Sequence, residues 1–599
     1  MRVDSRTESS HSGGPSTQHT AFLLLTAIVA VALPTLIAWN VAPSATFFNQ
    51  AAALVGWGGF LIVLATFLPR SAWPRSRGAL ALLAATTLTA LSALAASILG
   101  PVPSTLSLSA TGTILAAVLV VAVAASTQRA GLGGFAFRAF CIGLVVAGIG
   151  SALIGIVQVF APHVPDGQWV ALPALVGRAT GNLRQPNHLS SLLLWSVVAA
   201  VWLGEAKAFD DRIAAALAVV FIYVIVLTGS RTGALGMLTL AGWGLLDRRL
   251  SRRARIVLVL APLLYAAMWW ATSLWAAESR HVFGGQARFS ASGDMASPRL
   301  GIWSNALALI ASHPWFGVGF GDFNFAWTLT PFPGRPNEFY DHTHNLVLNL
   351  LVEMGVPLGT LVLALMLYAL RQALVNAIRH GREPGAAYPV QRAAFVIVFL
   401  VAVHSMLEYP LWYAYFLLPT AFAFGLCLER PAASEAAARA GDDGRPDATR
   451  PYAIAAMLLI LGATFAVYDY MRVVVIFAPP AGAGPLEQRI ADGRKSVLFG
   501  HHADYAAATV AEHPSEQMKA FERAPHYLLD SRMMMAWARA FEERGEIDKA
   551  RYLAARFKEF RNDQTEEFFA PCRPGAAPAG GMPFQCLAPR RTFRFEDFR

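Results

Sequence analysis

The chain has 599 residues, of which 55% are hydrophobic and only 14% are charged, whereas about a quarter of the residues of a soluble globular protein carry charge. This composition excludes an ordinary soluble protein and indicates an integral membrane protein. The net charge of +10 would favour nucleic-acid binding in a soluble chain. In a membrane protein, basic residues first mark the loops that stay in the cytoplasm, and we expect no nucleic-acid partner.

Residues 1–19 are rich in Ser, Thr and Gly and are expected to form a disordered cytoplasmic tail. The chain after them contains apolar runs long enough to be membrane helices, since about 18 apolar residues span the ~30 Å hydrocarbon core. The first run could be a signal peptide, but its length and the many runs that follow favour a retained helix. The thirteen runs lie near residues 20–39, 51–69, 79–99, 109–126, 136–161, 188–203, 213–229, 232–247, 256–276, 346–370, 393–408, 411–428 and 452–475.

Lys and Arg are distributed unequally between alternate loops. With the N-terminus inside, the inner loops carry far more Lys and Arg than the outer connections before the C-terminal tail, as the positive-inside rule requires. The sequence therefore predicts an all-α membrane domain over 20–475 with about 13 transmembrane helices and a large outer loop at 277–345. An odd number of spans places everything after the 476–485 linker outside.

The C-terminal residues 486–599 are charged and contain amphipathic segments, which predict a small helical outer domain. Cys572 and Cys586 lie in this domain, and an oxidising outer compartment would let them form a disulfide. Cys141 and Cys427 fall in apolar runs and are expected to be buried, unpaired side chains.

Polar residues that could carry chemistry gather on the outer side, in the sequences GRATGNLRQPNHLSSLLLW, EFYDHTHNLVLNLLVEMG and HSMLEYPLWYAYFLLP. Arg178, Arg184, Arg231 and Arg299 lie on this Arg-poor face. Because a guanidinium matches phosphate oxygens with two parallel hydrogen bonds, we interpret them as a diphosphate clamp, with Arg184 and Arg299 the stronger candidates. Loop salt bridges and snorkelling at helix ends remain the alternative.

His342 and His344 alternate at the entry to an apolar run, where a neutral imidazole could accept a hydroxyl proton. A metal site built on Asp341, His342 and His344 is a weak alternative because it offers too few ligands. Helix capping by Asp341 or Asn345 beside a solvated histidine is another.

Gln185 and Asn187 flank Pro186 at the start of another run. Pro186 favours an extended Gln185, and Asn187 can cap the helix that follows, which leaves the Gln185 amide available to a ligand. Glu408 and Tyr409, before Pro410, could instead form a helix break with a satisfied hydrogen bond.

The chain has no Walker A sequence, no CxxC pair and no DxD pattern. A site outside the cytoplasm has no supply of ATP or nucleotide sugar. A transferred group would therefore come from a pre-activated, membrane-borne donor.

The segments GNLRQPNHLSSLLLW, TGSRTGALG, PRLGIWSNALALIASHPWFGVGFGDF, HTHNLVLNLLVEMGVPLG and HSMLEYPLWYAYFLLP resemble those of the bacterial PglL-type O-oligosaccharyltransferases, the protein O-glycosylation ligases of the O-antigen ligase and polymerase superfamily. The resemblance extends in order over about 20–475, and the outer tail looks like the additional C-terminal domain of that family. It implies an inner-membrane glycosyltransferase without a metal or other cofactor. Such an enzyme moves a glycan en bloc from undecaprenyl diphosphate to Ser or Thr hydroxyls of periplasmic or pilin-like proteins.

Carried over residue by residue, the resemblance implies catalytic roles for His344, Gln185 and Tyr409, with His342 a competitor for the base. It implies contacts with the donor diphosphate or glycan for Arg184, Arg231, Arg299, Asn187 and His342.

Three other functions remain open. An O-antigen ligase that acts on lipid A core, or an O-antigen polymerase, would share the donor and differ in the acceptor. A multispan lipid or solute transporter would use Glu353 and Glu408 as proton-relay residues, but it should show inverted repeats, and none is evident in the sequence.

Overall fold

The computed structural model describes residues 17–69, 72–173, 175–279, 281–286, 298–379, 388–431, 449–574 and 582–599. The regular elements within these ranges are all helices, without a strand among them, as the all-α prediction requires. Residues 1–16 of the expected N-terminal tail lie outside the described ranges. Residues 17–19 already belong to the first helix, so the tail was predicted too long at this end.

The apolar part of the chain folds into helices that follow the predicted runs. They are α1 (Thr17–Val31), α2 (Leu33–Leu36), α3 (Phe47–Phe67), α4 (Arg77–Ile98), α5 (Ser104–Arg129), α6 (Gly133–Phe160), α7 (Pro186–Glu205), α8 (Asp211–Thr228), α9 (Arg231–Leu246), α10 (Arg252–Ser279), α14 (Leu346–Arg379), α15 (Val390–Ser405), α16 (Ala414–Leu428) and α18 (Thr449–Phe477).

Ten of the helices in the described part of the chain are long and apolar enough to cross a membrane. Each of the thirteen predicted runs contains a helix, but α9, α15 and α16 have only 16, 16 and 15 residues. A helix of that length rises about 24 Å, less than the ~30 Å hydrocarbon core. Thirteen crossings therefore remain a prediction.

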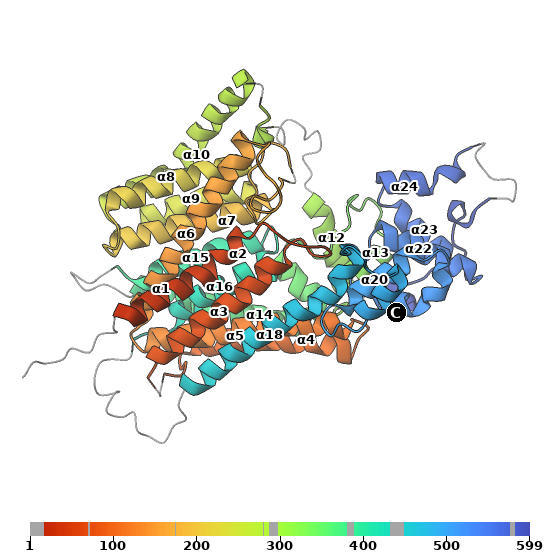
Figure 1. The fold of residues 1–599 in the computed structure, drawn as a ribbon, viewed down its shortest axis with the longest axis horizontal. Coiled ribbons are helices and arrows are strands. Elements are labelled where there is room, and N and C mark those ends of the chain that lie inside the picture. The colour runs from red at the N-terminus through yellow and green to blue at the C-terminus, as the bar shows by residue number, and fades with distance from the viewer. Residues whose placement is uncertain are drawn as a thin grey trace, which may run out of the picture.

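Helix α7 lies at the centre of the helical layer, where it packs against α6, α8, α9 and α15 (Figure 1). Nearly all of its residues are buried. Its small polar side chains are satisfied inside the protein: Ser196 donates to the Leu144 carbonyl at 2.8 Å, and Ser191 bonds His404 at 2.7 Å. A helix buried on all sides is a rigid support for the polar residues at its first turn.

The described part of the loop predicted at 277–345 includes helices α12 (Pro298–Ser312) and α13 (Phe323–Leu329). It is tied to a kink in α14 at Gly355, whose φ of 75° is left-handed. A side chain at Gly355 would meet the Trp315 backbone. The amide of Val318 donates to the Val352 carbonyl at 2.8 Å, and that of Val356 donates to the Pro314 carbonyl at 2.7 Å.

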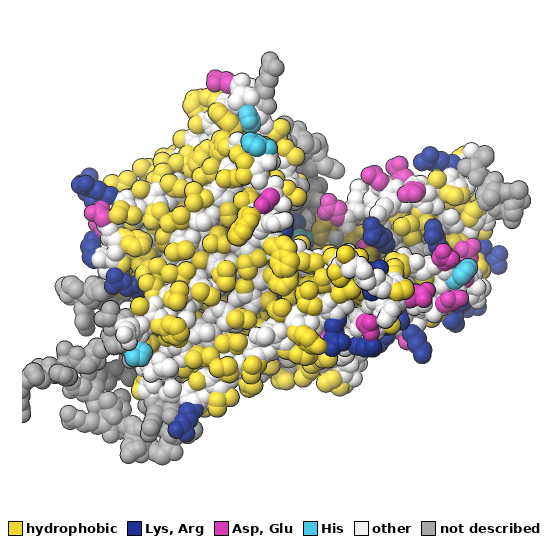
Figure 2. Space-filling model, viewed as in Figure 1, with side chains coloured by type: hydrophobic (Ala, Val, Ile, Leu, Met, Phe, Trp, Pro, Cys, Tyr) yellow, Lys and Arg dark blue, Asp and Glu magenta, His cyan; other side chains and the backbone are white. Residues whose placement is uncertain are grey.

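The C-terminal residues form a separate group of short helices beside α12 and α13 (Figure 1). Charged side chains gather on this part in Figure 2, whereas hydrophobic side chains cover the face of the long helices. Cys572 and Cys586 form the predicted disulfide, while Cys141 and Cys427 are buried and free. The helices are α19 (Leu486–Gly493), α20 (Gly500–Val510), α21 (Met518–Phe521), α22 (Ser531–Glu543), α23 (Ile547–Lys558) and α24 (Asp563–Phe568).

Buried polar contacts join these helices to α13. His526 pairs with Asp322 at 2.7 Å, and neither side chain is more than 1% exposed. The Tyr552 hydroxyl donates to the Leu329 carbonyl at 2.8 Å. An apolar cluster continues from α13 into α22 and α23. The loop before α14 is therefore held from two sides, by the kinked helix and by the C-terminal helices.

Candidate active site

Glu408, in the break between α15 and α16, is the centre of a polar cluster that collects side chains from three other segments. Its Oε1 accepts hydrogen bonds from Arg299 Nη2 at 2.5 Å and from Asn187 Nδ2 at 3.0 Å. Its Oε2 faces His344 Nδ1 at 2.8 Å. The first turns of α7 and α12 and the segment before α14 thus meet at one carboxylate.

The electrostatics of the cluster keep Glu408 ionised. Burial by itself would raise the pKa of this carboxyl, but the hydrogen bond from His344 and the positive charge of Arg299 outweigh burial and lower the pKa to about 2. A carboxylate held in this way fixes the orientation of its partners, because a bond to an ionised acceptor is stronger than one between neutral groups.

The backbone at His344 is left-handed, with φ of 54°. A non-glycine residue in this region carries strain and marks a position that its surroundings must hold. Thr343 supplies that support: its amide donates to Asn349 Oδ1 at 3.0 Å, and its hydroxyl donates to the Asn345 carbonyl at 2.8 Å. Trp303 Nε1 also donates to the Thr343 carbonyl at 3.1 Å.

The contact with Glu408 decides what His344 can do chemically. When Nδ1–H donates to the carboxylate, the lone pair of a neutral imidazole lies on Nε2, on the opposite side of the ring. The side chain is 15% exposed. In that tautomer His344 Nε2 is the ring atom that can accept a proton from a group at the surface of the cluster.

His342 occupies a different environment. It is only 3% exposed, its ring centroid lies 3.3 Å from that of Tyr409, and its Nδ1 pairs with Asp341. Burial lowers the pKa of His342, although Asp341 opposes the shift. His342 thus packs behind the cluster, and His344 is the histidine that meets Glu408.

Tyr409 lies beside both histidines, with its ring centroid 5.4 Å from that of His344. Burial and the neighbouring Tyr413 raise the pKa of the Tyr409 phenol well above its ordinary value. The phenol therefore keeps its proton and can donate a hydrogen bond.

The roles of Gln185 and Asn187 differ from those expected from the sequence. Gln185, not Asn187, caps α7: its Oε1 accepts from the His188 amide at 2.7 Å. Both polar atoms of the Asn187 side-chain amide are hydrogen-bonded: Nδ2 donates to Glu408, and Oδ1 accepts from the Ser230 hydroxyl at 2.6 Å. The expectation that Asn187 caps α7 was wrong, and the Gln185 amide is committed at its oxygen, since extended backbone before Pro186 also suits the cap position.

The three candidate arginines lie in different surroundings. Arg299 is the one whose described contacts include Glu408. Arg184, with a left-handed φ of 58°, donates to the carbonyls of Ala38 and Ala45 at 2.7 Å each and so fixes the loop after α2. Arg231 is exposed at the first turn of α9, directly after Ser230, on a cavity of about 360 Å³.

Two features of the cluster were not foreseen. The sequence suggested a helix break or a proton relay for Glu408, whereas the structure makes it the shared partner of Arg299, Asn187 and His344. Its position in an apolar run was the available signal. Arg178 has a structural role, because its Nε donates to the Thr228 carbonyl at the end of α8 at 2.8 Å.

The metal site considered from the sequence would need at least three ligands close together. Among the described residues, no group of three or more His, Cys, Asp and Glu side chains is arranged to hold a metal ion.

The fold defines a class of protein, the polytopic helical membrane proteins, and three family models match parts of the chain. Residues 216–364 match the family model described as O-Antigen ligase, and residues 392–564 match that described as Virulence factor membrane-bound polymerase, C-terminal. Residues 179–203 match the model described as Protein glycosylation ligase. The three matched ranges contain, respectively, Arg299 with His344, Glu408, and Asn187.

Two relatives point to a narrower group. The chain is 28% identical over 258 residues to the General O-oligosaccharyltransferase of Acinetobacter baylyi, a stretch that is 42% of this chain and 43% of that protein. It is 26% identical over 260 residues to the ComP-specific O-oligosaccharyltransferase of the same organism, or 42% and 44% of the two chains. Each match spans less than half of the relative's length. The resemblance to O-oligosaccharyltransferases is confirmed.

Proposed function

We propose that this protein transfers a preassembled glycan en bloc from undecaprenyl diphosphate to Ser or Thr hydroxyls of periplasmic or pilin-like proteins. The single observation that carries the proposal is the contact of His344 with the ionised Glu408, which also binds Arg299. This arrangement supplies a general base and a cation to one reaction centre.

The reaction needs a base because an acceptor hydroxyl is a weak nucleophile. His344 Nε2 takes the hydroxyl proton as the oxygen forms a bond to C1 of the first sugar. The bond between C1 and the diphosphate oxygen breaks, and the diphosphate leaves with the electron pair. Glu408 holds the imidazole and stabilises the imidazolium that forms.

Negative charge that develops on the diphosphate needs a cation already in place, since such contacts stabilise the transition state more than the ground state. A guanidinium has five N–H donors, so Arg299 can hold Glu408 and a diphosphate oxygen together. Arg231, at the positive end of α9, is the second cation of the proposal. Tyr409 and the Nε2 group of Gln185, whose Oε1 caps α7, orient the sugar, and no metal is used.

The proposed orientation follows the charge of the loops. The N-terminus is cytoplasmic in a bacterial inner membrane, and the cluster opens to the periplasm on the side of the C-terminal helices. We assign residues 20–475 to the membrane domain, 476–485 to a linker and 486–599 to a periplasmic domain that helps to dock the protein acceptor.

The family matches also favour a second candidate. Models described as an O-antigen ligase and a membrane-bound polymerase cover parts of this chain, so lipid A core or a growing lipid-linked glycan is the alternative acceptor. A transporter is disfavoured because the polar cluster gathers at one end of the long helices.

Purified protein with a labelled undecaprenyl-diphosphate glycan tests these acceptors side by side. We expect label on a Ser-containing pilin-like protein and none on lipid A core. Label on lipid A core or on longer lipid-linked chains would establish the second candidate instead. Label on no acceptor, with the lipid merely crossing a bilayer, would contradict both.

A further inference from the structure

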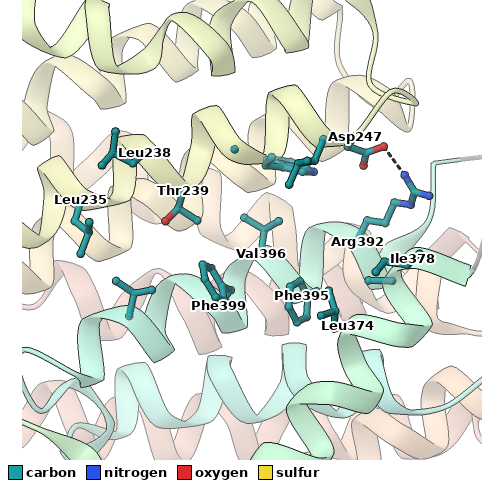
Figure 3. Close-up of a pocket in the computed structure, with 15 residues that line it drawn as sticks. Leu235, Leu238, Thr239, Asp247, Leu374, Ile378, Arg392, Phe395, Val396 and Phe399 are labelled. Carbon is teal, nitrogen blue, oxygen red and sulfur yellow. Dashed lines mark hydrogen bonds and ion pairs between the residues drawn. The ribbon is translucent and has the colours of Figure 1, made fainter.

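A long apolar cavity of about 830 Å³ lies between α9 on one side and α14 and α15 on the other (Figure 3). Its walls are almost entirely hydrocarbon, with Leu235 and Leu238 facing Phe399 and Val396 across the gap. Leu238 is 61% exposed and Phe399 is 39% exposed. The cavity is therefore open along its side, where a lipid chain can enter from the bilayer.

One end of this cavity adjoins the active site. Leu235 lies one helical turn after Arg231, and Val403, which also lines the cavity, is in the last turn of α15, just before the break that carries Glu408. From there the cavity follows α9 from Leu235 to Asp247, a stretch that rises about 18 Å. This stretch is more than half of the ~30 Å thickness of a hydrocarbon core.

The other end is closed by polar groups. Arg392 pairs with Asp247, and Tyr388 donates to the second Asp247 oxygen at 2.5 Å. Figure 3 shows this ion pair at the end opposite Leu235. The groove therefore has an apolar middle, with the Arg392–Asp247 pair at one end and the polar cluster beyond the other.

We propose that this α9–α15 groove binds the isoprenoid chain of the lipid-linked donor. The inference rests on the proposed function and adds the place where the tail of the donor lies. A linear hydrocarbon joined to a diphosphate near Arg231 and Arg299 would enter at Leu235 and Val403 and run beside Gly242. Because lipid is as apolar as the groove, binding gains from packing and from orientation of the diphosphate, not from exclusion of water.

Photo-crosslinking tests the location directly. A benzophenone amino acid replaces Leu238, and in the control it replaces Leu458 on α18, which is 62% exposed. We expect radiolabelled undecaprenyl-diphosphate glycan to crosslink at position 238 and not at 458. Equal labelling of both positions, or capture of phospholipid alone at 238, would overturn the proposal. Crosslinking needs no transfer, so it separates this proposal from the proposed function.

A steric block gives a second test. A side chain at Gly242 would meet nothing within 4 Å, and the same holds for Gly462 on α18, outside the groove. Gly242→Phe should lower kcat/KM for the undecaprenyl donor about tenfold, and Gly462→Phe should leave it unchanged. A Gly242→Phe protein with wild-type kcat/KM, or equal losses in both variants, would contradict the assignment.

Discussion

Replacing Glu408 by Gln tests how the carboxylate acts on His344. The change keeps the shape of the side chain but removes its charge. If the Gln oxygen keeps its bonds to Arg299 and Asn187, the amide N–H₂ must point at His344 Nδ1. His344 would then accept at Nδ1 and carry its proton on Nε2, the atom that has to receive the hydroxyl proton.

The size of the expected loss in rate follows from the contacts that Glu408→Gln changes. A hydrogen bond to a charged group contributes about 1.5–3 kcal/mol, and Glu408 holds His344 and Arg299 at 2.8 and 2.5 Å. A loss of about 3–4 kcal/mol of transition-state stabilisation lowers the rate about 10²–10³-fold. We therefore expect kcat for glycan transfer to fall by that factor, with a smaller change in the KM for the donor.

The matched control is Glu429→Gln, at the other end of α16. Glu429 is also buried, and its Oε1 accepts from the amides of Arg75 and Ser76 at 2.6 Å. Initial rates are measured on monodisperse protein, with a thermal melt of each variant. A Glu408→Gln protein that keeps more than about a third of the wild-type kcat, less than 1 kcal/mol of effect, would refute the reasoning.

Three further predictions concern two residues of the polar cluster and the contacts between α13 and the C-terminal helices. His344→Ala should abolish transfer and leave expression intact, and substantial residual activity would move the base to His342 or remove it. Arg299→Lys keeps the charge but loses the planar fork, so kcat/KM for the donor should fall about 10–100-fold; an unchanged value would exclude Arg299 from diphosphate binding. Asp322→Asn weakens the buried contact with His526 and the pair with Arg599, which should destabilise the C-terminal helices by about 1–3 kcal/mol, seen as faster limited proteolysis; unaltered digestion would show that these contacts do not hold them.

Sequence patterns were sufficient to locate the helices of the membrane domain because each apolar run is long and poor in charge. They were also sufficient for the disulfide of Cys572 and Cys586, which followed from the predicted outer location of the only two cysteines in the tail. Helices α9 and α15 show what the sequence patterns could not predict. Apolar composition located both helices, but their short lengths do not decide whether each crosses the bilayer.

The candidate site was predicted less well, because its geometry depends on long-range pairing. Sequence reasoning named His344 and Arg299 but could not show that Glu408 joins them. A glutamate in an apolar run has many potential partners, and its partners here come from distant segments. The exchange of roles between Gln185 and Asn187 arose because both residues can cap a helix, and only the position of Glu408 decides between them.

The intact mass of an acceptor protein after incubation with a lipid-linked glycan of known mass tests the central claim most directly. The account predicts that wild-type protein adds, in one step, the mass of the whole glycan less one water at a Ser or Thr, and that the Glu408→Gln protein adds almost none. An acceptor that stays unmodified, or that gains single sugars in succession, would contradict the account.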